Sequence, residues 1–158
     1  MLNFEFENDG HGFLGVRKIF LAALKNAEKV LGGMPKFKGR LNGKIILTLT
    51  GDAQIKALNK QYRGKNKSTD VLSFSYFGEA SFPVDDIIGE VVISIPTAKK
   101  QAREHDKTLN EELQFLFVHG LLHVFGYDHI AAGERKIMFD LQEKVLGTKS
   151  WREIYPAA

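Results

Sequence analysis

The stretch from Leu113 to Phe125 constrains the fold of this 158-residue chain most, because it is apolar nearly all round and carries no charged side chain. It is too short to cross a bilayer, and a helix that is apolar on all sides is typical of the centre of a domain. Thr108 and Glu111 form a capping-box pattern before it, so we predict a helix from Thr108 to about Phe125. The polar side chains of this helix need partners.

Two of those polar side chains are histidines four residues apart. Such residues lie on one helix face, so His119 and His123 can offer two imidazole nitrogens to one ion. Gly126 can end the helix in a left-handed conformation and let the chain turn His129 back toward the same ion. The chain has no cysteine, which excludes thiolate ligands. The spacing predicts one Zn²⁺ ion held by three histidines, with a fourth position open to water as in catalytic sites.

Three neutral imidazoles leave the charge of the ion uncompensated, so such a site attracts anions. A phosphate oxygen and a water of lowered pKa on the metal would suit phosphodiester cleavage. The histidine spacing also resembles that of the metzincin proteases, in which a glutamate follows the first histidine as general base. Gly120 stands at that position, so a zinc metalloprotease is the weaker alternative. Asp128 is either a solvated turn carboxylate or an acceptor that orients a ligand imidazole.

A second group of residues forms a basic patch near the predicted end of a helix. It comprises Lys56, Lys60, Arg63, Lys65 and Lys67. The planar fork of Arg63 can hold two phosphate oxygens, and the lysines add sequence-independent attraction to a nucleic acid. Basic residues at a helix C-terminus are also favourable for the helix dipole alone. The net charge of +3 permits a polyanionic partner without requiring one.

Hydrophobic periodicity predicts the remaining elements. Strands are expected at 2–7, 44–50, 70–77 and 87–95, the last two antiparallel, and helices at 13–31, 52–62, 96–104 and 133–146. Asp52 is the expected N-cap of the second helix, Ile137, Leu141 and Val145 should share one face of the last, and Met138 should lie in the core. The tail after Gly147 shows no periodicity and is expected to pack loosely. We predict an α+β fold in one domain, 1–158, with a four-stranded mixed sheet packed against the central histidine-bearing helix.

The composition of the chain and the pattern of its first residues indicate where in the cell the protein is expected. The hydrophobic fraction of 44% and the charged fraction of 26% are typical of globular proteins. The first residues lack the basic start and apolar core of a signal peptide. We therefore expect a cytoplasmic protein with no membrane partner.

Several motifs occur together in an order that resembles the YbeY family from about residue 45 to Gly147. They are Leu58-Asn59, Tyr62-Arg63-Gly64-Lys65, Ser68-Thr69-Asp70-Val71-Leu72-Ser73-Phe74, Ile88-Gly89-Glu90-Val91-Val92-Ile93-Ser94, Gln101-Ala102 and His119 to His129. The resemblance implies a single-strand-specific, metal-dependent endoribonuclease that uses zinc. It also implies a role in ribosomal RNA maturation, notably at the 3′ end of the small subunit, and in ribosome quality control.

Carried over by position, the three histidines match the metal ligands of the family, and Arg63 matches an arginine important for its activity. Single-stranded RNA, rRNA and the small subunit are the implied partners, and a ribosomal protein or an assembly GTPase would be consistent. Four positions depart from the usual pattern: Asn66, Ser68, Ser75 and Glu90.

Two questions stay open at the level of sequence. The general base could be Asp128 or Glu134, or the 2′-hydroxyl of the RNA could be the nucleophile. A non-cleaving ribosome assembly factor with a structural zinc is the alternative function. Its ion would need a fourth ligand from Asp128, His105 or His11.

Overall fold

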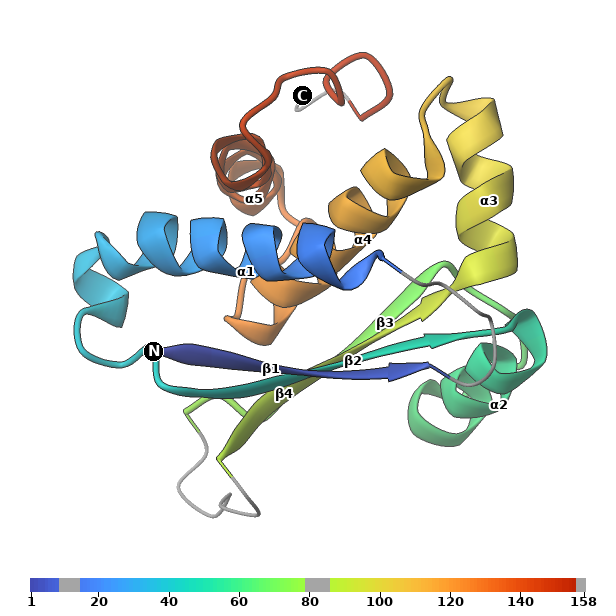
Figure 1. The fold of residues 1–158 in the computed structure, drawn as a ribbon, viewed down its shortest axis with the longest axis horizontal. Helices are drawn as coiled ribbons and strands as arrows, with labels where there is room; N and C mark the ends of the chain where they lie inside the picture. The colour runs from blue at the N-terminus through green and yellow to red at the C-terminus, as the bar shows by residue number, and fades with distance from the viewer. Residues whose placement is uncertain (9–14, 79–85, 156–158) are drawn as a thin grey trace.

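The computed structural model describes residues 1–8, 15–78 and 86–155, which form a sheet with helices on both of its faces (Figure 1). In chain order these are β1 (Leu2–Asn8), α1 (Arg17–Gly32), the 3₁₀ helix η1 (Pro35–Phe37), β2 (Gly43–Thr50), α2 (Asp52–Arg63), β3 (Val71–Ser75), β4 (Ile87–Ser94), α3 (Ile95–Glu104), α4 (Leu109–Val124) and α5 (Ala132–Leu146). The predicted α+β fold is confirmed. The start of the predicted helix at 13–31 falls partly outside the described residues.

The four strands form one mixed sheet in the order β1-β2-β4-β3. The first three of these are parallel to one another, and β3 runs antiparallel to β4, with Ser73 opposite Val91. The antiparallel pairing of the last two strands is therefore confirmed, although β3 ends at Ser75 and is shorter than predicted. Within the described residues β3 is an edge strand.

The helices cover the two faces of the sheet unequally. Figure 1 shows α1, α4 and α5 on one side and α2 on the other. Helix α4 approaches the sheet so closely that a β-carbon added to Gly120 would lie 2.8 Å from Cγ1 of Val91. On the far face, Ile55 of α2 packs against Leu72 and Val92. Residues with odd numbers on β3 and β4 thus face α4, and those with even numbers face α2.

Most of α4 is buried, as predicted for a central helix. Ten of its sixteen residues are buried, among them Leu113, Phe117 and Leu121. Helices α1, α3 and α5 and strands β3 and β4 all contact it. In the part of the chain that the structure describes, no helix is both long and apolar enough to cross a membrane.

Two predictions about individual helix residues are wrong. Gly51 is the N-cap of α2 and Asp52 is its first residue; the Asp52 carboxylate instead accepts hydrogen bonds from the hydroxyls of Ser94 and Thr97, which lower its pKa. Ile137 is 53% exposed, whereas Met138 lies in the core as expected.

The tail after α5 does not pack loosely. Trp151 is 5% exposed, and its ring stacks on Phe115 of α4 at 4.1 Å between centroids. Burial of a large aromatic ring stabilises the fold without any periodic pattern, so periodicity gave no signal for this contact.

Candidate metal centre

The local structure of α4 fixes the positions of His119 and His123. The capping box predicted at its start is present: Glu111 N donates to Oγ1 of Thr108 at 3.2 Å, and Thr108 N donates to Oε2 of Glu111 at 2.7 Å. The helix ends at Val124, and Gly126 then has φ of 90°, a value that side-chain-bearing residues rarely adopt. The chain therefore reverses and returns His129 toward the helix.

The three histidines converge. Their ring centroids lie 4.8 to 5.2 Å apart, and one nitrogen from each lies within 4.8 Å of the others. The Nε2 atoms of His119 and His123 are 3.2 Å apart. Two nitrogens bound to a tetrahedral zinc are about 3.3 Å apart, given Zn–N bonds of about 2.05 Å. The spacing of His119 and His123 therefore suits two ligands of one metal ion, and the three imidazoles together are a donor set that could hold such an ion.

A glutamine from α5 orients one of the imidazoles. Nδ1 of His119 lies 2.6 Å from Oε1 of the buried Gln142. When Nδ1 donates its proton to this oxygen, the lone pair of Nε2 faces the other histidines. Burial, with the nearby charge of His123, lowers the pKa of His119 to about 4, so the ring is neutral at pH 7.

Gln142 was not among the residues predicted from the sequence. A signal was present, because Gln142 stands four residues after Met138 and three before Val145, on the buried face of α5. A polar side chain at such a position needs a partner.

Arg63 is the last residue of α2 and reaches β3. It is exposed, and its Nη2 donates to the backbone oxygen of Ser73 at 3.0 Å. Burial lowers the pKa of His123, and the positive charges of His129 and Arg63 act in the same direction. The guanidinium is thus close enough to His123 for its charge to act on that imidazole.

The other polar residues considered from sequence take different places. Oδ1 of Asp128 accepts from the backbone N of His129 at 2.7 Å and so stabilises the turn, while its negative charge acts to raise the pKa of His123. Nδ1 of His105 lies 2.9 Å from Oε2 of the buried Glu112. Glu134 is exposed in the first turn of α5, and His11 lies outside the described residues. Among the residues described, the candidate metal group contains only the three histidines.

The position of the metzincin glutamate has no room for one. Gly120 is buried against the sheet, and its β-carbon would also lie 3.3 Å from Cγ2 of Val71. A glutamate there would be pressed into the valines of β3 and β4. The absence of that side chain thus follows from the close packing of α4 on the sheet.

Comparison with known proteins identifies the family. The family model described as Endoribonuclease YbeY matches residues 15–149. The chain belongs to the YbeY family. An Endoribonuclease YbeY of Sulfurihydrogenibium sp. is 49% identical over 66% of this chain and 68% of its own, and one of Heliobacterium modesticaldum is 44% identical over 65% and 67%. The solution structure of TM1509 from Thermotoga maritima has a TM-score of 0.57 and 28% identity, covering 99% of this chain and 95% of that one.

Two of the departures from the usual YbeY pattern have structural roles that can be described. Ser75 donates its hydroxyl to the backbone oxygen of Val124 at 2.5 Å and so joins β3 to the end of α4. Glu90 lies on the other face of the sheet, where burial and the nearby Glu7 raise its pKa. Neither substitution places a new group among the three histidines of this YbeY member.

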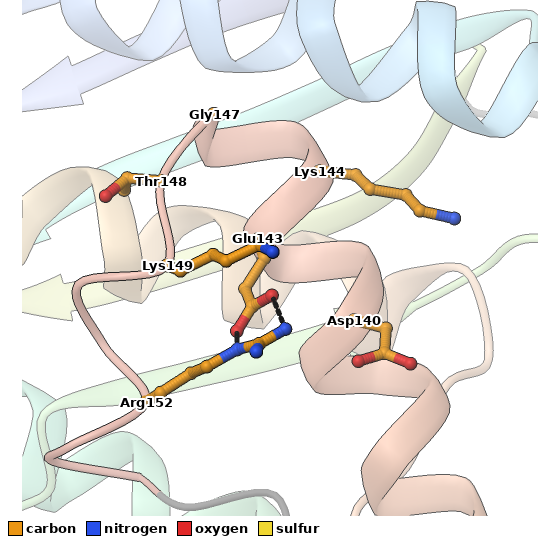
Figure 2. Close-up of a pocket in the computed structure, with 7 residues that line it drawn as sticks. All are labelled: Asp140, Glu143, Lys144, Gly147, Thr148, Lys149 and Arg152. Carbon is orange, nitrogen blue, oxygen red and sulfur yellow. Dashed lines mark hydrogen bonds and ion pairs between the residues drawn. The ribbon is translucent and has the colours of Figure 1, made fainter.

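A depression at the C-terminal end of α5 lies apart from the YbeY histidines (Figure 2). Within it, Arg152 forms two hydrogen bonds with Glu143, one of them from Nη2 at 2.7 Å, and Asp140 pairs with Lys136 outside its lining. This pairing ties the tail to α5. We therefore regard the depression as structural support for the tail.

Proposed function

We propose that this chain is a zinc-dependent endoribonuclease that cleaves single-stranded RNA. The observation that carries the proposal is the convergence of three imidazole nitrogens, with the exposed guanidinium of Arg63 anchored on Ser73 where its charge acts on His123. His119, His123 and His129 would hold the ion. When bound, zinc would supply a Lewis acid for a phosphate oxygen and lower the pKa of a coordinated water.

The residues of the chain itself have three tasks. The histidines hold a net positive centre, because neutral imidazoles do not compensate the charge of a divalent ion. Arg63 uses one N–H for Ser73 and has four further N–H donors for phosphate oxygens. As negative charge builds up on the phosphate during cleavage, a fixed guanidinium lowers its energy.

The proposal extends to ribosomal RNA. The family match and the relatives named Endoribonuclease YbeY support RNA as the substrate. We propose that the substrate is rRNA at the 3′ end of the small subunit, in maturation and in ribosome quality control, within the cytoplasm. A ribosomal protein and an assembly GTPase are the proposed protein partners.

An open coordination position separates this function from a non-cleaving assembly factor. A structural zinc closes its shell with four protein ligands. His105 is paired with Glu112, and Asp128 with the backbone of His129, which supports an open position. X-ray absorption spectroscopy of the zinc-loaded protein should reveal three imidazoles and one oxygen of water. Four protein ligands would favour the assembly factor.

The deciding experiment compares cleavage of a fluorescent single-stranded RNA by wild type, His123→Ala and Arg63→Ala, with zinc content measured in each. We expect Arg63→Ala to retain zinc and lose cleavage by about 100-fold or more, the effect of removing one fixed donor to a transition-state oxyanion. Arg103→Ala is the matched control, because Arg103 is also exposed and also donates to a backbone oxygen, that of Lys99. Equal cleavage by all four zinc-loaded proteins would contradict the proposal.

A chemical substitution in the RNA identifies the nucleophile. A single 2′-deoxy nucleotide at the cleavage site removes the hydroxyl that could attack the neighbouring phosphate. Continued cleavage would assign the attack to water, whereas complete loss would assign it to the 2′-hydroxyl.

A further inference from the structure

A pocket of about 340 Å³ opens directly beside the candidate metal centre. His119 and His129 form one part of its wall, and the rest includes Asp70, Arg135, Phe139 and Tyr155. These residues come from four places in the chain: the approach to β3, α4 with its following turn, α5 and the tail. A group in this pocket would therefore lie next to a phosphate held at the histidines.

The apolar part of the wall is built of flat rings. Tyr155 stacks on Phe115 with centroids 5.1 Å apart and planes 4° from parallel. Phe139 lies 6.1 Å from Tyr155, tilted by 31°. Unpaired bases of RNA bind proteins largely by stacking on such rings. The shape and lining of the pocket thus suit a planar heterocycle.

The tail holds this wall in place. Trp151 stacks on Phe115, the same ring that Tyr155 contacts. Arg152 is paired with Glu143 of α5 (Figure 2). Tyr155 follows these two anchors within four residues. The aromatic side of the pocket is therefore built before any ligand binds, which lowers the entropic cost of binding.

The polar part of the wall offers a donor and an acceptor. Nε of Arg135 is buried and has no hydrogen-bond partner among the described residues, while the guanidinium carbon lies 5.6 Å from the ring centre of Phe139. A buried donor without a partner is costly, and a shift of the Arg135 guanidinium that turns this N–H toward an acceptor in the pocket removes that cost.

The acceptor is the carboxylate of Asp70. It receives hydrogen bonds from Val71 N at 2.8 Å, Thr69 Oγ1 at 3.3 Å and Gln101 Nε2 at 3.1 Å. A carboxylate has about four acceptor positions, so one remains for a ligand. The three bonds also hold the carboxylate rigidly at the edge of the pocket.

We propose that this pocket receives one unstacked base of the RNA, next to the phosphate at the metal centre, and that Arg135 and Asp70 make it prefer guanine. The proposal rests on the proposed function, since it deepens the recognition of the same RNA. Guanine offers O6 and N7 as adjacent acceptors, which arginine contacts in pairs, and N–H groups on another edge for a carboxylate. Arg135 is thus assigned as a specificity-determining residue.

The test measures binding and does not depend on cleavage. Trp151 is the only tryptophan of the chain and lies one ring away from the pocket wall, so its fluorescence should respond to a base in the pocket. The zinc-loaded protein is titrated with guanosine 5′-monophosphate and with ribose 5-phosphate. Both carry the same phosphate, so a difference in affinity comes from the base. We expect the nucleotide to bind about 10-fold tighter or more, the effect of stacking one base.

Variants and other bases test the polar contacts. Arg135→Gln should remove most of the preference for guanosine over adenosine, cytidine and uridine 5′-monophosphates. Lys136→Gln is the control on the same helix turn, because Lys136 is exposed and points to Asp140. Equal affinity for guanosine 5′-monophosphate and ribose 5-phosphate would contradict the binding of a base in this pocket. An unchanged preference for guanosine in Arg135→Gln would contradict the role assigned to Arg135.

Failure of the two proposals can be told apart. If the zinc-loaded protein cuts no RNA but prefers guanosine 5′-monophosphate, the nuclease proposal fails and the base pocket stands. If RNA is cut while the nucleotide binds no better than ribose 5-phosphate, the nuclease stands and the base pocket fails.

Discussion

The two segments that carry the candidate ligands differ in how they are held. His119 and His123 lie on α4, a helix buried between the sheet and α5, and His119 is further fixed by Gln142. His129 is exposed and reaches the site through a turn that is held by the conformation of Gly126, by backbone hydrogen bonds to the end of α4 and by a bond from the His129 backbone to Asp128. The candidate site therefore has two halves. The buried half, His119 and His123 on α4, is held in position before an ion binds, and the exposed half, His129 and its turn, is where solvent and substrate enter.

The largest effect should come from the packing that fixes the buried half. Gly120→Ala places a methyl group 2.8 Å from Val91, so we expect the free energy of unfolding to fall by about 2 to 3 kcal/mol. Gly133→Ala is the control, because nothing lies within 4 Å of its added carbon and alanine favours a helix. Urea denaturation of both variants tests this, and equal changes in both would show that α4 can move away from the sheet.

The second effect concerns the orientation of His119. Gln142→Leu removes the acceptor for Nδ1 at similar volume, and we expect zinc affinity to fall about 10- to 100-fold, as for other partners of metal-binding histidines. Gln142→Glu keeps an acceptor and should keep most of the affinity. Competition with a chromophoric chelator measures both. Wild-type affinity in the leucine variant would mean that α4 alone orients the ring.

The third effect is a pH dependence in the metal-free protein. The folded His119 has a pKa lowered to about 4 by burial, against 6.5 for the model imidazole. Between these values the unfolded state binds more protons, so stability falls as the pH falls. His119 should contribute a loss of about 2 kcal/mol between pH 7 and pH 5.

His119→Gln isolates this contribution, since other groups titrate over the same range. Denaturation with chelator present, at pH 7 and pH 5, should give a smaller loss in the variant than in wild type. The same loss in both proteins would mean that the buried half does not keep His119 neutral.

The smallest effect is expected in the exposed half. Gly126→Ala forces a side chain into a left-handed conformation at φ of 90°, which should cost about 1 kcal/mol of stability. Gly126→Asn should cost less, because asparagine adopts left-handed conformations more readily. Zinc affinity should fall less than in Gln142→Leu. A fall in zinc affinity larger than that of Gln142→Leu would mean that the turn, and not the buried half, determines metal binding.

Sequence alone predicted the features that depend on local spacing. The capping box at Thr108 and the interval of four between His119 and His123 lie within one helix, and the structure has them as expected. The α+β class and the antiparallel pairing of β3 and β4 also followed from periodicity. These features need no knowledge of how distant segments meet.

Features that join distant segments were not predictable in the same way. Gln142 meets His119 across 23 positions, and Trp151 reaches Phe115 from a tail without periodicity. The strand order places β4 between β2 and β3, which no local pattern specifies. The polar residue on the buried face of α5 was the one such contact that the sequence signalled.

The hydrogen bond from Arg63 to Ser73 has a consequence for solubility. Ser73 lies in β3, one of the two edge strands of the described sheet, whose outward backbone groups could pair with a strand from another molecule. A charged guanidinium that occupies one of these carbonyls hinders such pairing, as lysines and arginines commonly do at the edges of natural sheets. The residue proposed to hold the phosphate thus also protects the chain against self-association, and its removal exposes a short edge where aggregation can begin.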